Sequence, residues 1–167
     1  YLATVGADER FGAEGLRLRQ AEAVARDVSA SLFTMDLEAG FPLDPTFLSV
    51  NGGGEVDASL LATTCSGFIH RQPVVTVNWT GTAQFIEAFF VSDHNPTLLV
   101  LTPDGQVLCN DNANPQLLDP VIQIDNPMEG QYKIWIGSAS ANQLIPGVLV
   151  LTTKPEINLG TFNLGGF

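Results

Sequence analysis

The side chains most able to do chemistry in this sequence are two cysteines and two histidines. His70 follows Cys65 closely, at a spacing where an imidazole could act as the base for a thiol nucleophile. A disulfide between Cys65 and Cys109 is the simpler interpretation of the same thiol. His94 lies among turn-forming residues, where a solvated loop position is expected. We therefore predict no catalytic dyad.

Cys65 and Cys109 are the only thiols, and two interpretations of them are open. They could be two buried free cysteines or one disulfide. Both flank predicted strands, and a surface poor in lysine and rich in Asn, Thr and Gly suits an extracellular protein, which favours the disulfide. In the chain-entropy model the long loop that it closes would make the bond worth roughly 4 kcal/mol.

The common catalytic motifs are missing from the sequence. There is no Gly-x-Ser-x-Gly elbow, no His-Glu-x-x-His helix and no glycine-rich phosphate loop. The glycine run at 52–54 precedes a predicted strand, so it cannot present the N-terminus of a helix to a phosphate. We expect a non-catalytic protein with no resident cofactor.

The charge of the chain limits its partners. The net charge is −11, with only 7 Lys and Arg against 18 Asp and Glu. Nucleic-acid binding needs clustered cations, and the one basic cluster is Arg17, Arg19 and Arg26, so no nucleic-acid partner is expected. The apolar runs are strand-sized, so no membrane insertion is expected either.

The pattern of apolar residues divides the chain into three parts. Residues 1–30 form an N-terminal arm, residues 31–154 a sandwich domain and residues 155–167 a strand-like tail. The arm and the residues just after it carry an alanine-rich stripe at helical spacing, and a helix or a solvated arm are equally consistent with it. The stripe comprises Leu18, Ala21, Ala25, Val28 and Leu32.

The middle part alternates apolar and polar residues in short runs. Residues 33–38 and 75–80 are typical of half-buried strands, whereas residues 84–91 are apolar on both faces. Gly, Pro, Asn and Asp separate the runs, and ten prolines at such breaks exclude a helical bundle. The expected fold is all-β, a two-layer antiparallel β-sandwich of the jelly-roll kind, with an N-terminal extension that is helical in one interpretation.

An ordered series of motifs from Leu37 to Thr153 resembles the bacterial pre-peptidase C-terminal domain, a secreted β-sandwich. This resemblance implies a non-catalytic domain and an extracellular or cell-surface location. The series consists of Gly40-Phe41, Asp44-Pro45, Gly53-Gly54-Glu55-Val56-Asp57, Cys65-Ser66-Gly67-Phe68-Ile69, Pro73, Thr97-Leu98-Leu99-Val100, Pro103-Asp104-Gly105, Cys109-Asn110-Asp111, Pro120, Asn126-Pro127, Gly130-Gln131-Tyr132, Ile134-Trp135-Ile136-Gly137 and Gly147-Val148-Leu149-Val150.

The resemblance also implies a weak calcium site. Members of the family carry an acidic cluster, but this chain has Asn95 and Asn112 where aspartates are usual, which removes ligand charge. The alternative is that the remaining aspartates cap turns. The candidate ligands are Asp93, Asn95, Asp104, Asp111 and Asn112.

The tail repeats the start of the sandwich. The run Thr34-Met35-Asp36-Leu37, followed by Gly40-Phe41, returns near the C-terminus as Thr161-Phe162-Asn163-Leu164, followed by Gly166-Phe167. Chance similarity is one explanation, and a strand able to fill an equivalent slot in a neighbouring subunit is the other. The candidate assembly residues are Ile157, Leu159, Phe162, Leu164 and Phe167.

Two functions follow as hypotheses. The first is an extracellular structural subunit that self-associates through its terminal segments into an oligomer, a filament or a surface layer. The second is an accessory domain of a secreted hydrolase that binds a polysaccharide or a matrix protein. Asn78 begins an Asn-Trp-Thr sequon and is a weak candidate for glycosylation.

Overall fold

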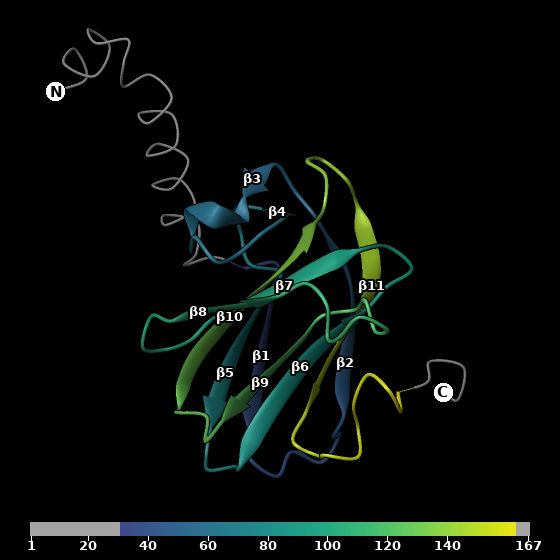
Figure 1. Cartoon of the computed structure of the whole chain (residues 1–167). Helices are drawn as coiled ribbons and strands as arrows, with labels where there is room; N and C mark the ends of the chain where they lie inside the picture. Colours follow the sequence, from purple (N-terminus) through teal and green to yellow (C-terminus); the bar gives the residue numbers. More distant parts are fainter. Residues whose placement is uncertain (1–30, 163–167) are drawn as a thin grey trace, which may run out of the picture.

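The computed structural model describes residues 31–162, and residues 1–30 and 163–167 lie outside this description. The predicted arm therefore falls outside the described residues, as do the tail residues Leu164 and Phe167. The described chain is all-β, which confirms the predicted class (Figure 1). Within it no helix is long and apolar enough to cross a membrane.

The described strands follow the predicted apolar runs. Their bounds are β1 (Phe33–Glu38), β2 (Thr46–Gly52), β3 (Val56–Asp57), β4 (Phe68–Ile69), β5 (Val75–Thr80), β6 (Phe85–Val91), β7 (Pro96–Leu101), β8 (Val107–Asn110), β9 (Val121–Asp125), β10 (Gly130–Ser138) and β11 (Ile145–Thr152). A single 3-10 turn, η2 (Ala58–Leu60), lies between β3 and β4, and the side chain of Asp57 caps it by accepting from the Ser59 amide.

The strands form two sheets that stack as a sandwich. The first sheet has seven strands, with β1, β5, β10, β4 and β3 in order, and β7 and β8 continuing from β10. The second sheet has four strands in the order β2, β11, β6 and β9. Every pair is antiparallel except β1 with β5, which run parallel. That pair departs from the predicted antiparallel arrangement, because residues 39–45 carry the chain from the end of β1 into the other sheet.

The core occupies the space between the sheets, where the alternating side chains meet. Val75, Val77 and Trp79 are buried there, as the alternation predicted. The opposite face of β5 is less exposed to solvent than predicted, since Thr76 is only 4% exposed. β5 is flanked on both sides by β1 and β10, and these neighbours cover a central strand more fully than its own sequence indicates.

A second, smaller cluster packs the lobe formed by β3, η2 and β4. Val56, Ile69 and Trp135 are buried in it together with Cys65. The lobe is held by little strand pairing, because β3 and β4 are two residues long and β4 shares one residue pair with β10. The lobe therefore depends on this cluster and on its covalent link to the sheet.

That link is a disulfide between Cys65 and Cys109, with Cα atoms 5.6 Å apart. The predicted disulfide is confirmed. It joins the loop between η2 and β4 to β8, across a sequence separation of 44 residues.

Reduction of the disulfide, or the paired change to serine, is expected to lower the free energy of unfolding by about 4 kcal/mol, because the unfolded chain regains the entropy of the closed loop. Denaturant unfolding with and without a reducing agent measures the difference. A free energy of unfolding that reduction leaves unchanged would contradict the assigned role of this bond.

The carboxylate of Asp44 joins the crossover after β1 to the end of β11. It accepts from Thr152 Oγ1 at 2.6 Å, from Thr153 Oγ1 at 2.5 Å and from the Thr153 amide at 3.1 Å. Lys154 Nζ donates to the Asp44 carbonyl oxygen at 2.8 Å. The start of the second sheet is thereby fixed to the beginning of the C-terminal segment.

Asp44→Ala is expected to destabilise the domain by roughly 3 kcal/mol, since it leaves several partly buried donors without an acceptor. Thermal or denaturant unfolding measures the loss. Asp125→Ala is the matched control, because the carboxylate of Asp125 accepts from the exposed Gln123 side chain and should cost little. Equal losses in the two variants would show that the Asp44 contacts do not hold the crossover.

Candidate functional site

The predicted calcium ligands are separated by the β7–β8 hairpin. Asp93 and Asn95 precede β7, and Asp111 and Asn112 follow β8, so the antiparallel register of the two strands brings these four residues to one end. Asp104 lies in the turn at the other end, where it accepts a hydrogen bond from Thr102. The structure thus brings four of the five candidates to one end of the sandwich and leaves Asp104 out.

The described polar groups at that end do not form a carboxylate cluster. The described residues contain no group of three or more His, Cys, Asp or Glu side chains placed to hold a metal. When the Asn112 amide is oriented to suit its neighbours, its nitrogen donates to the carbonyl oxygens of Asp111 and Leu118 at 2.9 and 3.0 Å. Burial raises the pKa of Asp119, and the negative charge of Asp93 adds to this, although the Ser92 amide opposes it. Calcium binding stays a prediction.

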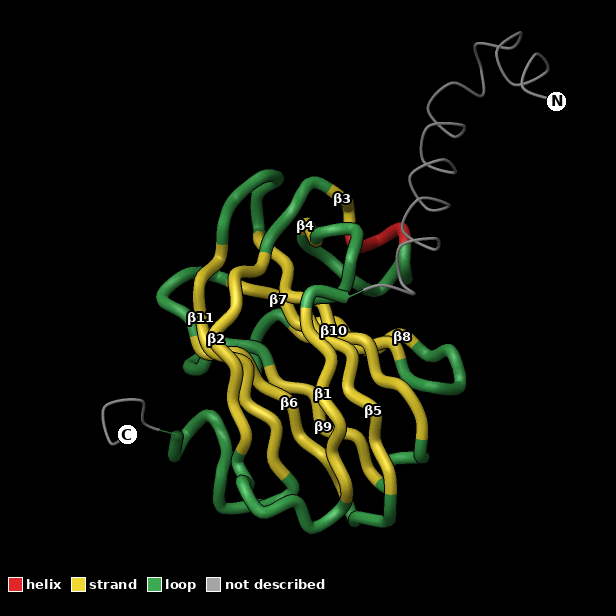
Figure 2. Tube along the Cα trace, turned by 180° about the vertical axis from the view of Figure 1, so that it is seen from behind, coloured by secondary structure: helices red, strands yellow, loops and turns green. Residues whose placement is uncertain are grey.

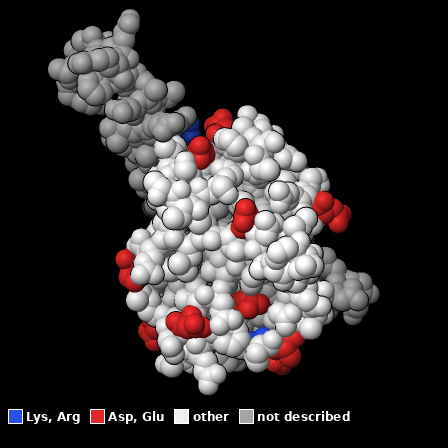
Figure 3. All heavy atoms as spheres, viewed as in Figure 1, with Lys and Arg blue, Asp and Glu red and all other residues white. Residues whose placement is uncertain are grey.

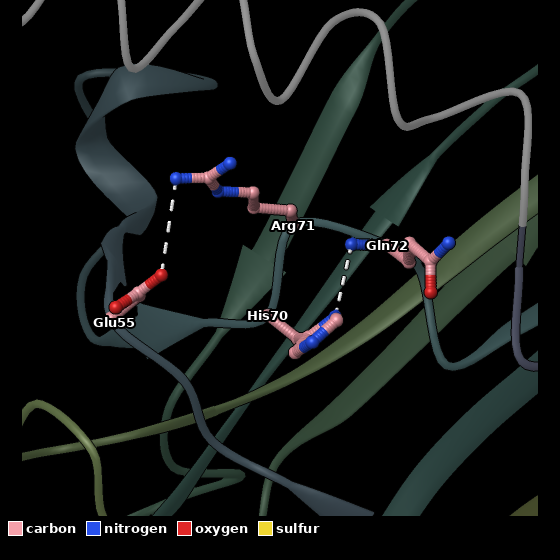
Figure 4. Close-up of polar contacts among 4 residues, drawn as sticks. All are labelled: Glu55, His70, Arg71 and Gln72. Atoms are coloured by element: carbon pink, nitrogen blue, oxygen red, sulfur yellow. Dashed lines mark hydrogen bonds and ion pairs between the residues drawn. The ribbon is translucent and has the colours of Figure 1, made fainter.

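The histidines do not complete a catalytic set. His70 Nδ1 accepts from the Gln72 amide at 3.1 Å, and the neighbouring Arg71 forms a 3.9 Å ion pair with Glu55 (Figure 4). Cys65 is in the disulfide, so it is not available to His70 as a thiol nucleophile. His94 is exposed, as expected, and its amide donates to Ser92 Oγ.

A shallow hollow of about 130 Å³ lies beside His70. Buried Trp135 is part of its lining, as are Gln72 and the exposed side chains of Leu32 and Leu144. A hollow of this size suits a single apolar side chain or a small ring better than an extended polymer.

The larger sheet ends in β1, and one side of this strand has no partner among the described strands. The Phe33 amide donates to Val74 at 3.1 Å and the Ala39 amide donates to Thr80 at 2.9 Å. Because the backbone groups of a strand alternate in direction, those of Thr34, Asp36 and Glu38 point away from β5. Within residues 31–162 no other strand pairs with β1. Figure 2 shows β1 next to its partner β5.

The side chains of β1 are only partly covered on the core side. Leu37 is buried in the main core, and Met35 packs against it as a half-buried residue. Phe33, on the same face, is 45% exposed. On the other face Asp36 Oδ1 accepts from Asn78 Nδ2 at 2.7 Å, so the amide nitrogen that a glycan would modify is used within the sheet.

The C-terminal segment differs from the predicted strand. Residues 155–162 form turns, in which Thr161 Oγ1 donates to the Glu156 carbonyl oxygen at 2.7 Å and the Phe162 amide donates to Asn158 at 2.8 Å. Local hydrogen bonds of Asn158 and Thr161 stabilise these turns against an extended strand, which would need a partner. Ile157 and Leu159 are half-buried in them.

This segment covers the outer face of the smaller sheet. Phe162 packs edge-on against Phe89 of β6, with ring centroids 5.4 Å apart and an interplanar angle of 73°. Phe89 and its neighbour Val150 are both fully buried although they lie on the face away from the core. Figure 1 shows the segment, in yellow, on the β2 and β11 side of the sandwich.

Glu87 lies on the same outer face, next to Thr152. Its Oε1 atom is buried and has no hydrogen-bond partner within the described residues. Burial raises the pKa of this carboxyl above its ordinary value of 4.5. A raised pKa in the folded state means that the fold favours the protonated acid, so this group lowers stability progressively as the pH rises through its folded-state pKa.

Glu87→Gln is therefore expected to raise the unfolding temperature at neutral pH, and this gain should disappear in acid, below the ordinary carboxyl pKa. Melting curves across a pH series measure it. Glu38→Gln, on the exposed edge strand, is the control. A gain that does not depend on pH would show that the charge of Glu87 is not its source.

The described residues define a disulfide-linked β-sandwich. No protein-family model matches the sequence, and no curated protein matches it.

Several solved structures are similar in fold. A periplasmic inhibitor of g-type lysozyme from Aeromonas hydrophila, PliG, is 17% identical with a TM-score of 0.40, over 75% of this chain and 100% of that one. The pre-peptidase C-terminal domain of a Bacillus anthracis collagenase is 9% identical with a TM-score of 0.38, over 72% and 94%. A mutant of the Escherichia coli g-type lysozyme inhibitor is 10% identical with a TM-score of 0.38, over 73% and 98%. A pre-peptidase C-terminal domain is thus among the similar structures, as the sequence resemblance predicted.

Proposed function

We propose that this domain is a non-catalytic extracytoplasmic structural module that self-associates by adding a strand to the open edge of β1. The observation that carries the proposal is the set of backbone groups of Thr34, Asp36 and Glu38, which point away from β5. Such an edge is a template for a strand from another chain. When the donor and acceptor surfaces differ, each subunit binds the next head to tail, and an open filament results if the rotation between neighbours does not close into a ring.

The surroundings of the edge support this proposal. The disulfide is typical of an oxidising compartment, outside the cytoplasm. The described surface carries many acidic and few basic side chains (Figure 3). Molecules with the same high negative charge repel one another, so the proposed association needs a specific contact. Backbone hydrogen bonds at β1, together with cover for the exposed Phe33, supply one.

Thr34→Pro tests the edge directly. It removes an N–H that points away from β5, and proline is tolerated at such edge positions, so the fold should survive while strand addition is blocked. Thr34→Val keeps the N–H and is the matched control. Sedimentation velocity of the full chain over a concentration series should show association in the wild type and in Thr34→Val. Thr34→Pro should raise the dissociation constant at least about tenfold.

A wild-type chain that sediments as a 17.8 kDa monomer at every concentration would overturn the proposal. Equal association of Thr34→Pro and Thr34→Val would overturn it as well. Circular dichroism of each variant shows whether the β fold is retained.

A second candidate is the accessory binding domain, and the hollow beside His70 favours it. In this alternative Trp135 and the exposed Leu144 contact a ligand, and the domain stays monomeric. Leu144→Asp would then abolish ligand binding and leave the sedimentation behaviour unchanged, which separates the two functions.

A further inference from the structure

We propose that the strand added to β1 is the C-terminal segment 161–167 of a second copy of this chain. This inference rests on the self-association proposed above, and it names the partner segment. Three observations carry it: the repeated sequence, the charge at the edge and the incomplete cover of the core side of β1. The present position of Phe162 supplies its test.

The repeated sequence makes the segment a copy of β1. In β1 the apolar positions Met35 and Leu37 face the core, and Thr34 and Asp36 face outward. The tail places Phe162 and Leu164 at the corresponding apolar positions. A strand with this alternation presents one apolar face and one polar face when it is extended.

The charge at the edge argues against pairing of β1 with itself. An antiparallel pair centred on Asp36 would set this carboxylate opposite Asp36 of the second copy, and like charges directly opposite each other are destabilising. Residues 157–167 contain no charged side chain. The tail can therefore lie along β1 without this repulsion.

The core side of β1 leaves apolar surface for the tail to cover. Phe33 is 45% exposed, and Met35 is half-buried against the main core. Phe162 and Leu164 of an added strand would lie on this same side and extend the core by one strand. Burial of such side chains is the main favourable term in strand addition besides the backbone hydrogen bonds.

The position of Phe162 on its own sandwich competes with this donation. Its ring packs against Phe89, and a side chain cannot occupy that site and a neighbour's β1 edge together. The packing within one chain therefore opposes assembly. A substitution of Phe89 should weaken this ring contact and release the tail. A substitution of Phe162 should weaken both the contact with Phe89 and the proposed contact with the neighbour's β1.

Two full-length variants that break the same ring pair are thus expected to act in opposite directions. Phe89→Leu keeps an apolar side chain in the buried position and should lower the dissociation constant of self-association about threefold, the size of one lost aromatic pair. Phe162→Ser should raise it at least about tenfold. Sedimentation velocity measures both, and Thr34→Pro added to Phe89→Leu should cancel the gain.

Changes of the same sign in the two variants would overturn the donation of the tail. The proposed self-association would still stand if the wild-type chain associates and Thr34→Pro prevents it, so the two failures are distinguishable. As a measurement that needs no substitution, a synthetic peptide of residues 157–167 added to the wild-type chain should cap β1 and lower the associated mass. A peptide that acts no more than its scrambled control would also overturn the inference.

Discussion

The parallel pairing of β1 with β5 is the constraint on which the proposed behaviour of this domain depends. It satisfies the backbone hydrogen-bonding groups on one side of β1. The backbone groups of Thr34, Asp36 and Glu38 are left directed outward. An antiparallel hairpin would have tied one end of β1 to its neighbour by a short turn. Instead the chain leaves β1 through residues 39–45, and Asp44 fixes this crossover to the far end of the smaller sheet.

The crossover after β1 also contacts the start of the C-terminal segment. Asp44 contacts Thr152 and Thr153, where the C-terminal segment begins, so the link from β1 and the start of the tail share one anchor. The tail then covers Phe89 on the outer face of the smaller sheet. A two-layer sandwich usually leaves its outer faces to water, and here one outer face is apolar enough to need a cover.

Much of the fold could be predicted from residue alternation and turn chemistry. The strands at 33–38 and 75–80 follow apolar periodicity, and the disulfide follows from two cysteines that flank predicted strands in a chain whose surface composition suits an extracellular protein. The direction of β1 could not be predicted, since alternation fixes which side chains are buried and not which neighbour a strand pairs with. The burial of Thr76 was missed for the same reason.

The candidate sites were predicted less well, because they depend on where loops meet. Asp104 resembles Asp93 in sequence context, but the length of the β7–β8 hairpin carries it to the opposite end of the sandwich. The tail was expected to be a strand, and Asn158 and Thr161 instead stabilise turns through local side-chain hydrogen bonds. The edge position of β1 has one signal in its side chains, since charges such as those of Asp36 and Glu38 are typical of a strand at the edge of a sheet.

Residue-resolved amide hydrogen exchange in β1 tests the central claim most directly, because it reports the open edge itself. The amides of Met35 and Leu37 should be protected at every protein concentration, since alternation directs them toward β5. Those of Thr34, Asp36 and Glu38 should exchange fast in dilute solution and become protected as the concentration rises. Fast exchange at these three amides at all concentrations would contradict the account.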